Sequence, residues 1–114
     1  MDRVTTAATD EDIRAVFRDG PLGVLVTHAS SRPLVDDLLM EASRLGLAIE
    51  VFFMDEGVRL LSDHGWVAAL PEGRYSACDL SARSRNVEPP ERVLVAGQYH
   101  NAMMVRDAAR VVSL

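Results

Sequence analysis

Short apolar runs alternate with segments of helical periodicity along most of this chain. The runs cover residues 22–28, 47–54, 75–80, 92–97 and 110–114. The first of them, LGVLVTH, is a continuous apolar stretch that ends in polar residues. Runs of this kind are typical of strands buried in a parallel sheet.

The segment between the first two runs predicts an amphipathic helix over residues 30–46. Pro33 falls in the first turn and Gly46 follows the last periodic position, as helix starts and stops commonly require. The apolar stripe of this helix consists of Leu34, Val35, Leu38, Leu39, Ala42 and Leu45.

Four further helices are expected from caps, stops and periodicity. A leader helix over residues 9–19 has Thr9 or Asp10 as its cap and ends at Gly20-Pro21. Short helices are expected over 56–65 and 81–86, with an irregular segment at 66–73 between them, and a longer helix over 98–109.

The alternation of strands and helices favours a parallel sheet that is covered on both faces. We therefore predict an α/β, flavodoxin-like three-layer fold with about five mostly parallel strands and helices on both faces. Residues 1–20 form the leader with its short helix, and residues 21–114 form the domain.

Composition narrows the possible functions. The chain has 114 residues and a formal net charge of -5, without a basic tract, so nucleic acid is not an expected partner. No apolar run approaches the ~20 residues of a membrane span, and the acidic start does not have the pattern of a signal peptide. A cytoplasmic location is expected. All 12 basic residues are arginine, which excludes a Schiff-base lysine or a Walker lysine in this chain.

Chemistry-bearing residues follow the predicted strands. In an open α/β sheet, ligands bind beyond the carboxyl ends of the strands. His28, Asp55, Cys78, and Gln98 or His100 fall at or just past those ends. The widely spaced histidines and the single cysteine do not make a metal signature, and no cofactor is expected.

Cys78 is the strongest candidate. A helix is predicted to start just after it, and Arg83 and Arg85 lie on that segment, so helix amides and positive charge would favour the thiolate. His28 or His100 would be an acid–base neighbour. The alternatives are an inert buried thiol and solvent-facing loop histidines.

The segment after the cysteine admits one enzyme motif. A tyrosine phosphatase needs Cys-x5-Arg, but the sixth residue after Cys78 is Ser84, so that motif fails by one place. Cys-x4-Arg, with Arg83, is similar to the persulfide-bearing loop of rhodaneses, although that loop usually carries glycine and this one has none.

Four stretches together resemble the DsrE/DsrF-like family, which includes the TusB, TusC and TusD sulfur-relay subunits. They are LGVLVTHAS, IEVFFMDEGVRLL, CDLSARSRNV and AARVVSL, and the likeness spans residues 21–114. Cys78 stands in the position of the family's active cysteine. The leader is extra, and Asn86 stands where glycine is common.

The resemblance implies an α/β fold, trimers or hexamers or hetero-oligomers with paralogues, and no flavin or metal. It also implies that Cys78 accepts a persulfide sulfur from a TusA-type or rhodanese-type donor and passes it to a DsrC- or TusE-type acceptor. The alternatives are a non-catalytic oligomeric scaffold or small-ligand-binding module, and a single-domain rhodanese-like sulfurtransferase. A reactive thiol should be partly exposed, and a scaffold thiol should be buried.

Overall fold

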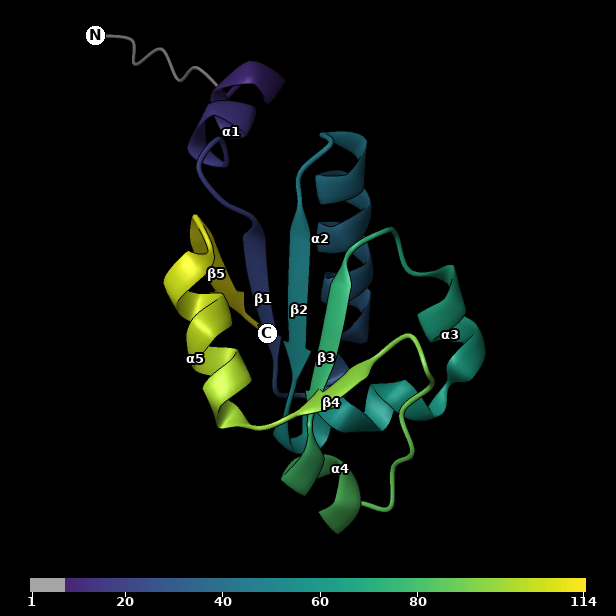
Figure 1. Cartoon of the computed structure of the whole chain (residues 1–114). Helices are drawn as coiled ribbons and strands as arrows, with labels where there is room; N and C mark the ends of the chain where they lie inside the picture. The colour runs from purple at the N-terminus through teal and green to yellow at the C-terminus, as the bar shows by residue number, and fades with distance from the viewer. Residues whose placement is uncertain (1–7) are drawn as a thin grey trace, which may run out of the picture.

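A computed structural model describes residues 8–114 and contains one five-stranded sheet (Figure 1). Its strands are β1 (Leu22–Val26), β2 (Ile49–Phe53), β3 (Arg74–Cys78), β4 (Leu94–Ala96) and β5 (Arg110–Ser113). Every pairing is parallel, and the strand order is β4-β3-β2-β1-β5. The predicted parallel α/β fold is confirmed, whereas the strand order could not be read from the sequence.

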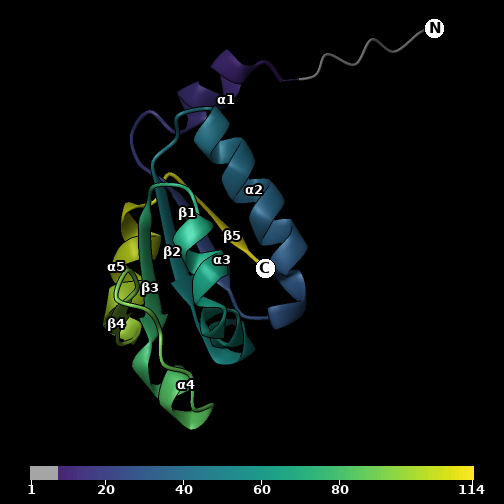
Figure 2. The ribbon, with the colours of Figure 1, turned by 90° about the vertical axis from the view of Figure 1, so that its right-hand side faces the viewer.

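Helices cover both faces of this sheet. The chain runs through α1 (Asp10–Val16), η1 (Ala29–Ser31), α2 (Arg32–Arg44), η2 (Asp55–Ser62), α3 (His64–Ala69), α4 (Asp79–Ser84) and α5 (Gln98–Asp107). Figure 2 shows α2 and α3 on one face and α5 on the other. The arrangement has the three layers of a flavodoxin-like fold.

The larger apolar core lies between the sheet and α2. Alternate side chains of the central strands, such as Val24, Val51 and Phe53, are completely or almost completely buried there with Leu39 of α2. The opposite face carries a smaller cluster of Phe52, Cys78 and Met104, with Leu25 and Met54 packed against it. Cys78 therefore belongs to the thinly covered face under α5.

Helix α2 follows its predicted stripe with one exception. Val35, Leu39 and Ala42 are buried, and Gly46 adopts the left-handed conformation (φ 73°) that ends the helix. Leu34 is 59% exposed instead of facing the sheet. A short 3₁₀ turn precedes α2, so the helix starts at Arg32, and Leu34 in the first turn points away from the core.

The segment after β2 departs from the prediction. The first part of the helix expected over 56–65 is the 3₁₀ helix η2, which ends at Ser62, and α3 begins at His64 and continues into the segment expected to be irregular. Asp63 caps α3 by accepting from Trp66 N at 3.0 Å, and Trp66 Nε1 donates to Asp36 Oδ1 at 2.7 Å. These tertiary bonds stabilise a helix of only six residues, too short to show a periodic pattern.

The leader helix α1 is present and has the predicted cap. Thr9 and Asp12 form a reciprocal capping box. Arg44 of α2 pairs with both carboxylate oxygens of Asp10 at 3.0 Å, and Arg14 Nε donates to Leu45 O at 3.0 Å. The part of the leader before residue 8 lies outside the described residues. Within residues 8–114, none of the helices has the length and apolar character needed to cross a membrane.

Candidate thiolate site at the carboxyl end of the sheet

The chain connections after β3 and β4 leave toward opposite faces of the sheet. The connection after β3 packs into the larger core through Ala82, Val87 and Val93, whereas α5 after β4 packs onto the other face through Met104. The two strands are neighbours, with Cys78 aligned to Ala96. Divergence of this kind creates the crevice where open α/β sheets bind ligands. Cys78 is the last residue of β3 and stands at this point of divergence.

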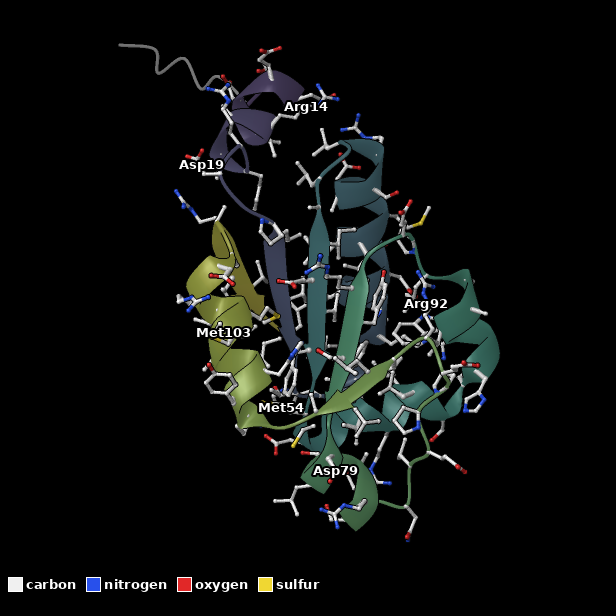
Figure 3. All side chains as sticks on the ribbon, in the orientation of Figure 1. Arg14, Asp19, Met54, Asp79, Arg92 and Met103 are labelled. Atoms are coloured by element: carbon white, nitrogen blue, oxygen red, sulfur yellow. The ribbon has the colours of Figure 1, made fainter. Side chains whose placement is uncertain are left out.

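The backbone of Cys78 makes it the N-cap of α4, with φ -67° and ψ 121°. Cys78 is 5% exposed and is covered by the cluster that it forms with Phe52 and Met104 under α5. Figure 3 shows Met54 and Asp79 gathered at this end of the molecule, opposite Arg14 of the leader. The thiol is thus close to the surface but shielded by a single layer of side chains.

Hydrogen-bond donors lower the pKa of this thiol. Burial raises the pKa of Cys78, but the hydroxyl and backbone N–H of Ser81, the side chain of Gln98 and the backbone N–H of Leu80 outweigh it. The pKa is therefore held below its ordinary value. A thiol packed only among apolar groups would shift the other way, because desolvation disfavours the charged form.

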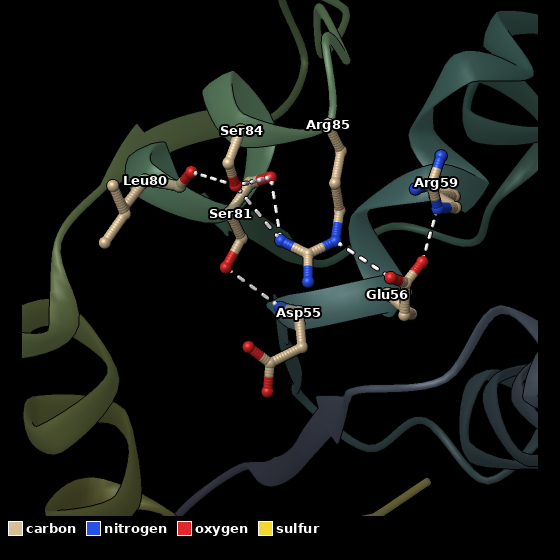
Figure 4. Close-up of polar contacts among 7 residues, drawn as sticks. All are labelled: Asp55, Glu56, Arg59, Leu80, Ser81, Ser84 and Arg85. Carbon is tan, nitrogen blue, oxygen red and sulfur yellow. Dashed lines mark hydrogen bonds and ion pairs between the residues drawn. The ribbon is translucent and has the colours of Figure 1, made fainter.

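Ser81 is fixed by a second bond that frees its proton for the sulfur. Its Oγ accepts from Asp55 N at 2.9 Å, as Figure 4 shows, so its own O–H can be donated to the sulfur. Asp55 adopts a positive φ of 50°, which turns its N–H toward α4. Gly57, two residues later, is required because a Cβ there would lie 2.1 Å from Val26 O. The Asp-Glu-Gly turn after β2 therefore helps to position Ser81, the residue whose donors lower the pKa of Cys78.

The two arginines have other partners in this arrangement. Arg83 pairs with Asp79 at 2.9 Å on the surface of α4. Arg85 pairs with Glu56 of η2 at 3.3 Å and donates to Ser81 O at 3.3 Å, which ties α4 to η2 (Figure 4). The groups that lower the pKa of Cys78 are all uncharged donors. Support of the thiolate by Arg83 or Arg85 stays a prediction.

The two histidines lie at different distances from the cluster around the cysteine. His100 stacks on Phe52, with ring centroids 6.4 Å apart, and Phe52 belongs to the same cluster as Cys78. His28 is exposed, and its Nδ1 lies 2.8 Å from Thr27 Oγ1. Both follow strand ends as expected, and only His100 joins the Cys78 side of the sheet. Their acid–base role stays a prediction.

Sequence reasoning missed Ser81 and the Leu80 amide as groups acting on the sulfur. Ser81 is three residues after Cys78, which is the spacing at which an N3 side chain reaches back to an N-cap residue. That spacing is present in the sequence, but cysteine is not a usual capping residue, so the pattern does not by itself indicate a cap. The sequence places Gln98 at a strand end and indicates no role for it.

Two surface depressions lie elsewhere on the molecule. One of about 740 Å³ is at the amino ends of the strands, lined by Glu50, Glu72 and Asp107 among others. A smaller one of about 380 Å³ lies on the sheet face that carries α5 and reaches His100, Ser76 and Met104. The larger is remote from Cys78 and at the wrong end of the sheet for the usual α/β site. Across residues 8–114, no cluster of three or more His, Cys, Asp or Glu side chains is arranged to hold a metal ion.

Comparisons of the sequence with protein-family models and with curated proteins find no match.

Proposed function

We propose that the protein carries sulfur transiently as a persulfide on Cys78, between a sulfur donor and an acceptor protein. The observation that supports this most is the lowered pKa of one shielded thiol, caused by hydroxyl and amide donors, at the carboxyl end of β3 beside β4. Such donors favour the thiolate, which is the form that attacks sulfur. The choice of sulfur as cargo comes from the resemblance to DsrE/DsrF-like proteins.

The proposed transfer conserves atoms and electrons at each step. The Cys78 thiolate attacks the outer sulfur of a donor persulfide, R–S–SH. The Cys78–S bond forms as the donor S–S bond breaks, and the donor leaves as the thiolate R–S⁻. The outer sulfur keeps its proton, so Cys78 now carries S–SH. An acceptor thiolate then attacks that outer sulfur and releases the Cys78 thiolate, without any external oxidant or reductant.

A second candidate is a scaffold or small-ligand-binding module in which Cys78 is inert. The 5% exposure of Cys78 favours it, because a reactive thiol was expected to be partly exposed. The lowered pKa opposes it, since an inert packed thiol has no need of four donors. The carrier function therefore requires the side chains over the sulfur to move when a donor docks.

A rhodanese-like sulfurtransferase is less well supported. The Cys-x4-Arg segment forms helix α4, and Arg83 is paired with Asp79 at 2.9 Å. Those residues do not wrap around the sulfur as an anion-binding loop would. No feature of the described residues favours this function over the carrier.

We also propose that the chain works as an oligomer, either with copies of itself or with paralogues. The edge strand β4 exposes Leu94 and Val95, and Leu80 and Tyr99 are exposed on the neighbouring helices. An edge strand with apolar side chains is a template for pairing. The expected donor is of TusA or rhodanese type, and the expected acceptor is of DsrC or TusE type.

Mass spectrometry after incubation with a small persulfide donor tests the carrier function. The intact protein should gain the mass of one sulfur atom, and a thiol acceptor added afterwards should remove it. Cys78→Ser is a clean control, because the chain contains one cysteine. Failure of the wild-type protein to gain sulfur, with its thiol free and the fold intact, would favour the scaffold.

A further inference from the structure

The sheet face that carries α5 is only partly covered. Of the helices within residues 8–114, only α5 lies on this face (Figure 2), and Figure 1 shows it beside β5 and β1, with no helix in front of β2 and β3. The smaller depression, of about 380 Å³, lies on this part of the sheet and is lined by residues of β2, β3, β4 and α5. Its volume falls within the roughly 300–1,000 Å³ of small-molecule sites.

Two polar residues interrupt the apolar strands on this face. Side chains alternate along a strand, so Glu50 faces the same side as Phe52, and Ser76 faces the same side as Cys78. Strands of a parallel sheet are commonly apolar on both faces. The residues of β2 that face α2 are all apolar, so this strand is polar only on the side of the depression.

The contacts of Ser76 within the protein do not account for its place in the sheet. It lines the depression and is 5% exposed, whereas a serine on a face that only met water would be well exposed. Its hydroxyl donates to Val51 O over a long 3.4 Å, and no donor to its oxygen is present among residues 8–114. Buried polar groups are normally satisfied. The Ser76 oxygen is therefore a buried acceptor that is open to a ligand in the depression.

Glu50 adds a carboxylate whose partners are weak. Its side chain is 19% exposed and lines the same depression. Arg74 Nη1 lies 3.7 Å from Glu50 Oε1, too far for a hydrogen bond, and solvent screens this 88% exposed arginine. The second arginine in the lining, Arg92, is held by three backbone carbonyls at the end of α3. The Glu50 carboxylate is therefore the charged group of the depression with free hydrogen-bonding capacity.

The rest of the lining offers flat and apolar surfaces. The ring of His100 is half-buried and stacks on Phe52, with centroids 6.4 Å apart. Met104 is buried, and Leu94, which is aligned with Ser76 on β4, is exposed. Methionine sulfur makes favourable contacts with aromatic rings. A mostly apolar depression with a few polar groups is the usual form of a small-molecule site.

We propose that the smaller depression binds a small organic cation, whose charged nitrogen donates to Glu50 and whose flat apolar body lies against Met104 and Leu94. Charge-assisted bonds to a carboxylate are strong, and an amidinium group makes two of them in parallel. An anion would be repelled by the Glu50 carboxylate. The inference goes beyond the sulfur carrier, because Cys78 is not among the residues that line the depression.

Titration of the ¹⁵N-labelled full chain with benzamidine, followed by NMR, tests this site. Millimolar benzamidine should shift the amide signals of Ser76, Leu94 and His100 in a saturable way. Benzamide has the same shape without the charge and should bind the wild type about tenfold more weakly. In Glu50→Gln, which has the same shape as the wild type, the two compounds should bind with equal, weak affinity.

Glu72→Gln is the matched control, because Glu72 lines the larger depression and not the smaller one. It should bind benzamidine as the wild type does. The inference would be overturned by the absence of saturable shifts, or by benzamide binding as tightly as benzamidine to the wild type. Tighter binding of benzoate than of benzamidine would contradict the charge of the proposed ligand. Loss of binding in Glu72→Gln, with Glu50→Gln unaffected, would assign the cation to the larger depression.

Discussion

At the scale of residues, the lowered pKa of Cys78 comes from short-range, uncharged hydrogen-bond donors. The sulfur is shielded, and burial alone would raise the pKa of Cys78. The hydroxyl and amide of Ser81, the Gln98 side chain and the Leu80 amide outweigh that effect and lower the pKa. The pKa of Cys78 therefore depends on the local geometry, because each hydrogen bond needs a particular distance and direction.

Ser81→Ala should therefore raise the pKa of Cys78. The substitution removes the hydroxyl donor, and the thiolate fraction near neutral pH falls. We expect alkylation of Cys78 to slow about three- to tenfold near neutral pH and to be unchanged at high pH. Ser84→Ala is the matched control, since Ser84 Oγ donates to the carbonyls of Leu80 and Ser81. Equal profiles for wild type and Ser81→Ala would remove Ser81 from the site.

Arg83→Ala should leave the same profile unchanged. Arg83 is 71% exposed and is paired with Asp79, so its field at the sulfur is screened by solvent and by its partner. For the same reason, added salt should not shift the midpoint of the wild-type profile. A slower Arg83→Ala protein, or a midpoint that rises with salt, would restore the electrostatic role that the sequence suggested for this residue.

The position of Cys78 was predictable, and its hydrogen-bond partners were not. An apolar run ending in cysteine before a helix places the thiol at a strand end in any parallel α/β fold. The effect of Gln98 on the pKa of Cys78 depends on the β3–β4 pairing, which aligns Cys78 with Ala96 across a long loop. No local pattern in the sequence specifies that alignment.

At the scale of elements, the strands were predictable and the short helices between them were not. Continuous apolar runs predicted all five strands, of which β1, β2 and β3 are mostly buried and β4 and β5 are largely exposed. Helix α3 has six residues and is held by Asp63 and by the contact of Trp66 with Asp36. Tertiary contacts of this kind override weak local propensity. The turn after β2 was expected to start a helix, and its Asp-Glu-Gly sequence proved to have a packing function.

Gly57→Ala tests that function. A Cβ at this position would meet Val26 O at 2.1 Å and Val26 C at 2.6 Å, both backbone atoms that cannot move cheaply. We expect a loss of about 2–3 kcal/mol in the free energy of unfolding, measured by urea denaturation. Gly65→Ala, inside α3, has only Asp63 Oδ1 at 3.6 Å and should gain about 0.5–1 kcal/mol. Similar stabilities for the two variants would contradict the proposed close packing of η2 against β1.

At the scale of the whole molecule, the strand order determines where Cys78 lies in the fold. The connections from β1 to β2, from β2 to β3 and from β3 to β4 lie on the sheet face that carries α2. The connection from β4 to β5 crosses the opposite face through α5. The point of reversal is the carboxyl end of β3 and β4, where Cys78 lies. The three-layer architecture follows from the alternation of strands and helices in the sequence. The order of strands follows from which long-range pairings bury the most apolar surface, and a single sequence does not reveal it.

The exposed edge of β4 gives a prediction about assembly. If the chain self-associates through this edge, light scattering should show an oligomer at tens of micromolar, and Val95→Lys should reduce its mass, because lysine on an edge strand opposes pairing. Met40→Lys, at a 64% exposed position on α2, is the control and should leave the mass unchanged. A wild-type protein that is a monomer at this concentration would contradict self-association.

Sulfur uptake by Cys78 as a function of pH tests the carrier function together with its physical cause. The rate at which the protein gains one sulfur atom from a small persulfide donor should be measured by mass spectrometry across the neutral and alkaline range. The alkylation rate of the same cysteine should be measured in parallel. Because the attacking species is the thiolate, both rates should rise with the same midpoint, and that midpoint should lie below the pKa of about 8.5 of a free cysteine thiol. A midpoint at or above that value, or alkylation without sulfur uptake at any pH, would contradict the carrier function.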